Sequence, residues 1–441
     1  MNTCDISIHL CLQCIIQYID YYIIHKSITS EITRTHYCIN IIAGITRIQY
    51  SCVYVMSIDK ILRPLLINSY VCGCRVAELS ADIPRWLGFL YILLLWSLYI
   101  FFYIYKIIFN VSHYSIVYHI CYGVTIFTAL LSIILGIYHD KAFKNCIKKL
   151  IIVDETLEKL EIITDYNKLR MTTVWLILGL LFMYILIICG KMRLLRNEYN
   201  IDSGPLIYLP FMRSFCVYAN IIGDLIITSM LGYVGLKFDQ VNEYLEKLIK
   251  NNDKINRTWK HPLLLCHQSG HAKILRIKDV IWIVIHLHLE LRKISRKIDS
   301  IFGIQMTLEI GCYFASIALA AREIFKVILT KNYISNNNKM LYITIIVLWL
   351  SIDVFRLFLI NYTCEKISIK ANATGNIINK LSYFNCDVET RENMLQFLLL
   401  IQSPIRFCGL GLFQFGFKFF QRFATSVATV LVIVIQAYTH E

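Results

Sequence analysis

Seven stretches of 20 or more mostly apolar residues constrain the fold of this chain more than any other feature of its sequence. An α-helix rises about 1.5 Å per residue, so about 20 residues cross the roughly 30 Å hydrocarbon core of a bilayer. Unpaired backbone groups are costly in lipid, so each stretch is expected to be helical. The predicted spans are 87–109, 115–138, 171–190, 206–237, 301–328, 340–362 and 411–438. The sequence therefore predicts an all-α, polytopic membrane protein with seven transmembrane helices.

The composition agrees with a membrane protein. Of the 441 residues, 57% are hydrophobic and only 17% are charged, whereas soluble domains carry nearer 25% charge. The formal net charge of +14 does not indicate nucleic acid as a partner, because Lys and Arg are concentrated between the apolar stretches. The 16 Cys are interpreted as small apolar core residues rather than a disulfide framework, since several fall inside spans.

The distribution of basic residues predicts the orientation in the membrane. Segments on one side hold four basic residues in 56–86, seven in 139–170, twelve in 238–299 and four in 363–402. The segments on the other side hold none, three, two and none. Basic residues favour the cytoplasmic side, so the N-terminus is predicted to be cytoplasmic and the C-terminus extracellular. This orientation puts the sequon at Asn110 outside, where it is a glycosylation candidate.

Two segments outside the spans have distinct predictions. Residues 139–170 carry apolar side chains at helical spacing among charges, which is typical of an amphipathic cytoplasmic helix. Residues 238–299 are expected to be a long cytoplasmic loop. Residues 1–55 show no signal peptide, and we interpret them as a lineage-specific extension or a gene-model artefact.

The last span carries a polar seam on one helical face. Polar groups at membrane depth are costly unless they face protein or water. The seam is therefore expected to face either neighbouring helices, which Ser and Thr commonly link, or an aqueous pathway. Its members are Lys418, Arg422, Ser426, Thr429, Ile433 and Gln436.

Charged residues inside the spans are functional candidates by default. Arg213 and Asp224 on the fourth span are too far apart along the helix to pair. Arg213 lies near the outer end, where it contacts a ligand or extends to the headgroups. Glu309, together with Asp353 and Arg356 at i and i+3, is expected toward the cytoplasmic side in an ion-pair network.

Tyrosines in the outer halves of the spans suit either a small-molecule pocket or an interfacial aromatic belt. With Arg213 they are the ligand-binding candidates. They are Tyr118, Tyr122, Tyr208, Tyr218, Tyr313 and Tyr342.

The sequence offers little that indicates catalysis. Only His267 and His271 have metal-ligand spacing, and a membrane metalloenzyme needs several such pairs, so a solvated loop is the preferred interpretation. The chain contains no Gly-rich phosphate loop, nucleophile elbow or paired-carboxylate signature. No enzyme activity, metal or cofactor is expected.

Three segments resemble the insect gustatory receptors in the same order. Thr429, five apolar residues at 431–435 and Gln436 match the C-terminal signature of that family, although Val430 stands where Tyr is usual and Ala437 where Phe is usual. Residues 408–415 resemble the approach to its last helix, and residues 287–306 its run into the fifth span. The resemblance covers 58–438.

The resemblance implies a chemosensory receptor that acts as a ligand-gated, non-selective cation channel in the plasma membrane, with sensory dendrites as the expected location. It implies a tetramer, homomeric or formed with related subunits. Residues 87–362 would form the bundle that binds a small-molecule tastant, 363–409 a cytoplasmic anchor after a cytoplasmic region at 1–86, and 410–441 the pore helix and tail. Glu309, Asp353 and Arg356 would then belong to the anchor between subunits.

The same resemblance assigns roles along the last helix. Thr429, Ile433, Gln436 and Ala437 would line the pore and its gate, and Lys418, Arg422 and Ser426 a wider vestibule. The alternatives are a seven-span metabotropic receptor and, behind it, a transporter or membrane enzyme. The predicted orientation is opposite to that of a G-protein-coupled receptor, and the Asp-Arg-Tyr and Asn-Pro-x-x-Tyr motifs of that class are absent.

Overall fold

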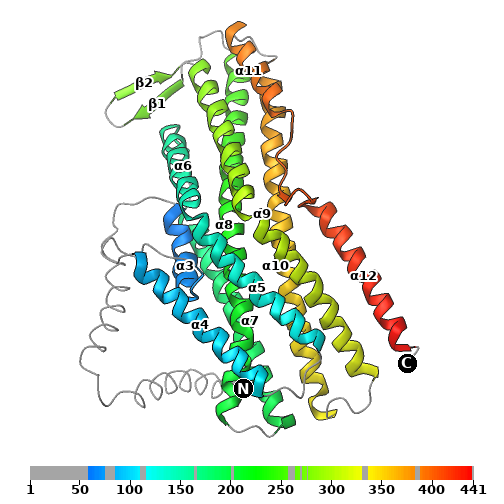
Figure 1. Cartoon of the computed structure of the whole chain (residues 1–441). Coiled ribbons are helices and arrows are strands. Elements are labelled where there is room, and N and C mark those ends of the chain that lie inside the picture. Colours follow the sequence, from blue (N-terminus) through cyan, green and yellow to red (C-terminus); the bar gives the residue numbers. More distant parts are fainter. Residues whose placement is uncertain are drawn as a thin grey trace, which may run out of the picture. The chain divides into compact units, whose positions relative to one another are not determined.

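The structure is a computed structural model that describes residues 58–74, 85–109, 116–162, 166–199, 203–256, 264–268, 271–275, 277–329, 336–382 and 388–439 (Figure 1). Clustering of contacts divides the chain into residues 1–55 with 78–85, and residues 56–77 with 86–441. The described residues belong to the second unit except for Arg85. That unit is a bundle of long helices.

The predicted fold class is confirmed, since the described chain is mostly helical and several helices are apolar enough to span a membrane. Four of them, α4, α7, α8 and α10, meet this description alone, and α5 with α6, bent by 63° at His139, adds a fifth. The helices are α3 (Ile58–Val71), α4 (Arg85–Phe109), α5 (Ile116–Tyr138), α6 (Asp140–Lys159), α7 (Tyr166–Tyr199), α8 (Ser203–Asn256), α9 (Ile277–Leu329), α10 (Asn336–Ser382), α11 (Val388–Ile401) and α12 (Phe417–Thr439).

The expected loop at 238–299 is largely helical, which corrects the sequence-based prediction. Helix α8 continues without a break to Asn256, and α9 begins at Ile277. Phe238, Val241 and Leu245 are fully buried at helical spacing, so packing on neighbouring helices sustains these turns beyond the apolar stretch. Between them, β1 (Leu264–Gln268) and β2 (His271–Leu275) pair antiparallel, with Cys266 opposite Lys273. Likewise, α10 extends to Ser382, twenty residues past its predicted span.

The last helix begins at Phe417 rather than at Gly411. Leu410, Gly411 and Gly416 have φ angles of 51°, 74° and 144°, and residues with positive φ do not continue a right-handed helix. The segment instead forms a small hairpin of β3 (Cys408–Gly409) and β4 (Phe413–Gln414). The hairpin and the turn at Gly416 therefore set the direction in which α12 leaves the bundle.

Helix α8 lies at the centre of the described bundle and packs against α3, α5, α7, α9 and α10. Buried Ile367 of α10 packs closely on it, since a Cβ on Gly235 would lie 3.1 Å from the Ile367 side chain. A smaller cluster joins α4, α5 and α8 around Trp96. Trp96 Nε1 donates to Gly73 O at 3.1 Å, so the end of α3 reaches the middle of the first predicted span. The prediction of a cytoplasmic region at 1–86 stays a prediction.

Candidate functional site

A single stripe of side chains holds α12 to the rest of the bundle. Phe423 and Val427 are nearly buried on it. The Phe423 ring lies 5.7 Å from the Phe314 ring of α9, and the Phe420 ring lies 6.0 Å from the Phe358 ring of α10. Because these positions recur every three to four residues, they occupy one face. Helix α12 therefore contacts its own chain from one side, beside α9 and α10 (Figure 1).

The six predicted seam residues of α12 are all exposed. Ile433 keeps 59% of its surface exposed. Ser426 Oγ donates to Arg422 O and Thr429 Oγ1 donates to Thr425 O, both at 3.0 Å. The hydroxyl protons are thus used inside the helix, and the oxygen lone pairs are left to accept hydrogen bonds from outside. The Ala437 side chain lies outside the described residues.

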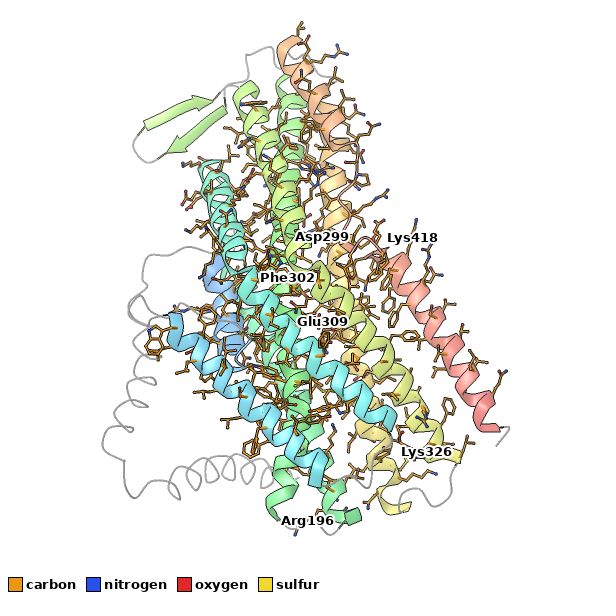
Figure 2. All side chains as sticks on the ribbon, in the orientation of Figure 1. Arg196, Asp299, Phe302, Glu309, Lys326 and Lys418 are labelled. Atoms are coloured by element: carbon orange, nitrogen blue, oxygen red, sulfur yellow. The ribbon has the colours of Figure 1, made fainter. Side chains whose placement is uncertain are left out.

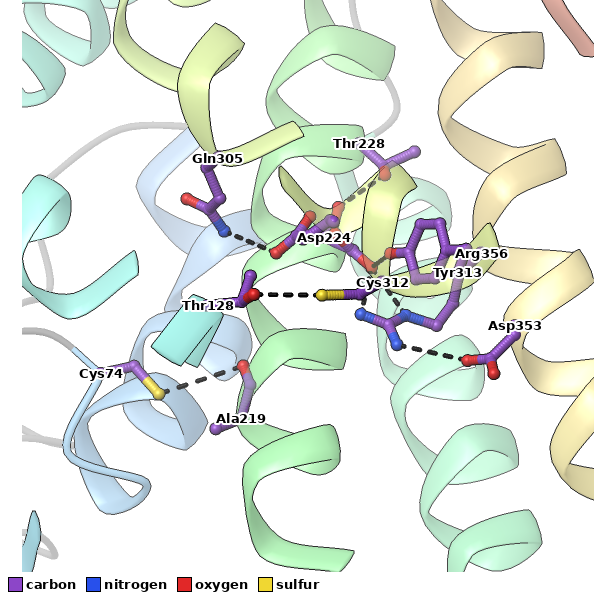
Figure 3. A network of polar contacts seen from close by, with 11 residues as sticks. Cys74, Thr128, Ala219, Asp224, Thr228, Gln305, Cys312, Tyr313, Asp353 and Arg356 are labelled. Atoms are coloured by element: carbon purple, nitrogen blue, oxygen red, sulfur yellow. Dashed lines mark hydrogen bonds and ion pairs between the residues drawn. The ribbon is translucent and has the colours of Figure 1, made fainter. Parts of the chain in front are cut away.

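Four of the charged residues predicted within spans meet in the interior of the bundle (Figure 3). Arg356 of α10 donates from Nε to Asp224 Oδ2 of α8 at 2.6 Å, and its Nη1 lies 3.6 Å from Asp353 Oδ1. Tyr313 of α9 also donates to Asp224. Glu309, one turn before Tyr313, accepts a hydrogen bond from Gln305 at 3.0 Å. The structure therefore brings Glu309, Asp353 and Arg356 together.

The position of this cluster differs from the expectation in one respect. It lies inside one chain, among α8, α9 and α10, and its role in an anchor between subunits stays a prediction. Asp224 was linked by sequence only to Arg213 of the same helix, whose side chain lies outside the described residues. The partners of Asp224 come from two other helices, and spacing along one helix does not reveal such pairs.

The candidate tyrosines are distributed over separate places. Tyr122 packs in the Trp96 cluster, with its hydroxyl 2.7 Å from that of Tyr99. Tyr218 accepts a hydrogen bond from Asn68 and packs on Tyr184. Tyr313 belongs to the ion cluster. Tyr342 reaches Glu323 at 3.4 Å. The Tyr118 and Tyr208 side chains and the sequon at Asn110 lie outside the described residues.

Sequence reasoning missed a second buried ion pair. Lys237 of α8 is fully buried, and its Nζ lies 2.8 Å from Asp154 Oδ1 of α6. Tyr233 donates to the other carboxylate oxygen, and Nζ lies 5.5 Å from the ring centre of Tyr166 in α7. The pair joins three helices. The missed signal was a lysine on the same helical face as buried Val234 and Val241.

The region next to α11 combines a buried aromatic contact with exposed leucines. Phe397 is buried against His288 of α9, with ring centres 5.2 Å apart. Burial, reinforced by Arg292, lowers the pKa of His288 to about 3, so this imidazole is neutral and serves as a packing group. Leu399 and Leu400, by contrast, are 71% and 63% exposed. Helix α11 therefore presents an apolar surface that the other described residues of the chain do not cover.

Charged residues also mark two levels of the bundle. Figure 2 shows Asp299 and Lys418 at one level, and Arg196 and Lys326 toward the far end of the helices, with Glu309 between them. Asp299 Oδ1 accepts a hydrogen bond from Cys408 N at 3.1 Å, which ties α9 to the hairpin before α12. The segment that leads into α12 is thus held to α9 at Asp299.

Comparisons with known proteins agree with this architecture. The profile of the family described as 7tm chemosensory receptor matches residues 62–439. A structure of the insect olfactory receptor OR5 from Machilis hrabei in complex with eugenol aligns with a TM-score of 0.54 and 13% identity, covering 86% of this chain and all of that chain. A second OR5 structure aligns at 0.55 and 14%, with the same coverage. No match was found among curated protein sequences.

Proposed function

Because the chain belongs to the 7tm chemosensory receptor family, we propose that it is a gustatory receptor, a ligand-gated non-selective cation channel opened by a small-molecule tastant. The observation that carries the proposal is the one-sided attachment of α12, which leaves Lys418, Arg422, Ser426 and Thr429 exposed. The signature at 429–436 favours a gustatory over an olfactory receptor.

The seam is the part of α12 that needs further partners. Polar groups on a lipid-facing surface are costly, and the cost falls if they face water or another protein. Four chains arranged around one axis, each turning its seam inward, would supply both: a water-filled path and a neighbouring helix. The exposed leucines of α11, Leu399 and Leu400, would supply contacts between subunits in the cytoplasmic anchor.

The order of residues along the seam indicates how the path would work. Four Ile433 side chains would form an apolar constriction, which closes a pore by excluding water. Gln436 would offer carbonyl oxygens near the outer end, and such a ring favours cations only weakly. Lys418 and Arg422 would repel cations in a narrow pore, so they are assigned to a wide vestibule in which salt screens them.

The gate is tested by a polar substitution at Ile433. Ile433→Ser should give current without any ligand, because a serine ring stays wet. Val432→Ser is the matched control, since Val432 is also exposed, at 52%, but lies about 100° around the helix. Recordings from cells with equal surface amounts of each variant make the comparison. If Ile433→Ser channels reach the surface and stay silent, the gate lies elsewhere.

A second test separates the channel from a metabotropic receptor. An epitope placed after residue 441 should be stained on intact cells, because the positive-inside pattern predicts an extracellular C-terminus. Staining only after permeabilisation would reject this orientation. The tastant is proposed to bind among the second to sixth predicted spans of each subunit at the plasma membrane. Tyr122 and Tyr218 are the described candidates to substitute first.

A further inference from the structure

The charges of the buried cluster at α8, α9 and α10 do not balance. Asp224, Glu309 and Asp353 are between 1% and 4% exposed, and Arg356 is 5% exposed. Arg356 is the base that the described chain places beside them, with Nη2 2.6 Å from Asp224 Oδ2 and Nη1 3.6 Å from Asp353 Oδ1. Full ionisation would therefore leave two negative charges in excess inside the protein, where charges without partners are strongly disfavoured.

The groups around the cluster do not supply the missing positive charge. Ser316 donates to Asp353 at 2.5 Å, Gln305 donates to Glu309, and Tyr313 donates to Asp224. On the α5 side, Thr128 contacts Cys312 at 3.1 Å. All of these groups are neutral donors, so they stabilise single carboxylates without offsetting the excess.

Two buried carboxyl oxygens in this negatively charged cluster lack a hydrogen-bond donor among the described residues. The Glu309 carboxyl group lies beside the turn of α8 that carries Asp224, since its Oε1 is 4.0 Å from the point that a Cβ on Gly223 would occupy. Asp224 Oδ1 and Glu309 Oε2 are both buried, and the described residues give neither a hydrogen-bond partner. Two carboxylates that share one site cannot both ionise at low cost. A hydrogen bond between them requires a proton on one of them.

Gly223 makes room for this arrangement. A Cβ atom at Gly223 would lie 2.8 Å from Gln305 Nε2 and 4.0 Å from Glu309 Oε1. The Gln305 amide, which orients Glu309, occupies the space that any larger residue would fill. The described residues contain no group of three or more His, Cys, Asp or Glu side chains that could hold a metal ion.

We propose that Glu309 holds a proton, as a neutral carboxylic acid hydrogen-bonded to the Asp224 carboxylate. In this state Arg356 pairs with Asp224, and Glu309 donates to the Asp224 oxygen that otherwise lacks a donor. The site lies next to the contact that holds α12, because Tyr313 contacts Asp224 and its neighbour Phe314 packs on Phe423. Loss of the proton would therefore disturb the packing of α12. This inference does not depend on which ligand opens the protein or on whether it conducts ions.

Infrared spectroscopy of the purified full chain in lipid nanodiscs tests the site directly. The wild type should show the carbonyl stretch of a protonated carboxylic acid at neutral pH, shifted in D₂O. Glu309→Gln and Asp224→Asn should each lose this band, because the remaining carboxyl group is then free to ionise beside Arg356. Asp353→Asn is the matched control and should keep the band. A wild type without the band, or a band lost only in Asp353→Asn, overturns the proposal.

Thermal unfolding supplies an independent readout. Glutamine carries the same hydrogen-bond donor as a protonated glutamate, so Glu309→Gln should unfold near the wild-type temperature at pH 7. On raising the pH, the wild type should lose thermal stability as Glu309 gives up its proton, whereas Glu309→Gln should not. If Glu309→Gln is markedly destabilised at pH 7, Glu309 is ionised and the proposal is overturned. The same conclusion follows if sodium stabilises the wild type and its thermal stability does not change with pH.

Discussion

The buried Asp154–Lys237 pair allows a prediction whose size follows from the structure. The side chains are 5% and 0% exposed, so removal of either one leaves an unpaired charge in the interior. Breaking such a pair costs about 3–5 kcal/mol. We expect Lys237→Met to lower the free energy of unfolding by that amount. Removing the Tyr233 hydroxyl, which donates to the same carboxylate, should cost about 1.5–3 kcal/mol.

A double variant measures the interaction energy between Asp154 and Lys237 apart from their contacts with other residues. Asp154→Leu with Lys237→Met removes both charges and leaves apolar side chains among Tyr166, Tyr233 and their neighbours. Replacing a whole buried pair by apolar groups is often neutral or stabilising. The double variant should therefore cost no more than either single change, which gives a coupling energy of about 3 kcal/mol.

Equilibrium unfolding of the purified full chain in mild detergent, titrated with SDS, measures these values. Lys250→Met is the matched control, because Lys250 is exposed on the same helix and its replacement should change stability by no more than about 0.5 kcal/mol. If Lys237→Met behaves like the control, or if the two single costs simply add, the pair is not buried as the structure has it.

Three further predictions concern the segments that lead to α12 and the anchor. Gly416→Ala should abolish surface expression, because φ is 144°, a conformation that L side chains rarely adopt, and the new Cβ would also displace the Glu365 side chain, whereas Gly411→Ala, with φ of 74° and open space around it, should cost only about 1–2 kcal/mol. Burial raises the pKa of Asp299 from 3.8 to about 6, so the folded chain holds this proton more tightly than the unfolded chain, and stability should fall as the pH rises from about 4 to about 6. Asp299→Asn should lack that part of the pH dependence in thermal unfolding, and an unchanged profile would contradict the assignment. Leu399→Asp should shift the purified protein toward smaller assemblies in native mass measurements, and an unchanged mass would place the subunit contacts elsewhere.

The membrane helices were predictable because the bilayer imposes their length and composition. Each predicted span coincides with a helix for most of its length, although the last one is helical only from Phe417, and for the second span the helix bounds differ from the prediction by one residue. The ends of α8, α9 and α10 were not predictable in the same way. Residues such as Phe238 and Val241 alternate with charges there, so hydropathy falls although tertiary packing keeps the chain helical.

The buried polar contacts were predictable only in part. Asp353 and Arg356 were linked because they lie at i and i+3 on one helix. Asp224 and Lys237 find their partners on other helices, and a single sequence does not indicate which faces of two helices meet. The sequence does show that a charged residue lies in an apolar stretch. This identifies the position as unusual but does not indicate which residue pairs with it.

The attachment of α12 by one face has a consequence for how the protein is made. In a newly inserted chain, Thr429 and the other seam residues would face lipid before any neighbouring subunit covers them. Helix α12 is therefore expected to be less stable in an unassembled chain than in an assembly. The endoplasmic reticulum would then retain single chains until assembly covers the seam. If two kinds of subunit assemble together, the number that reaches the cell surface would follow the scarcer of the two.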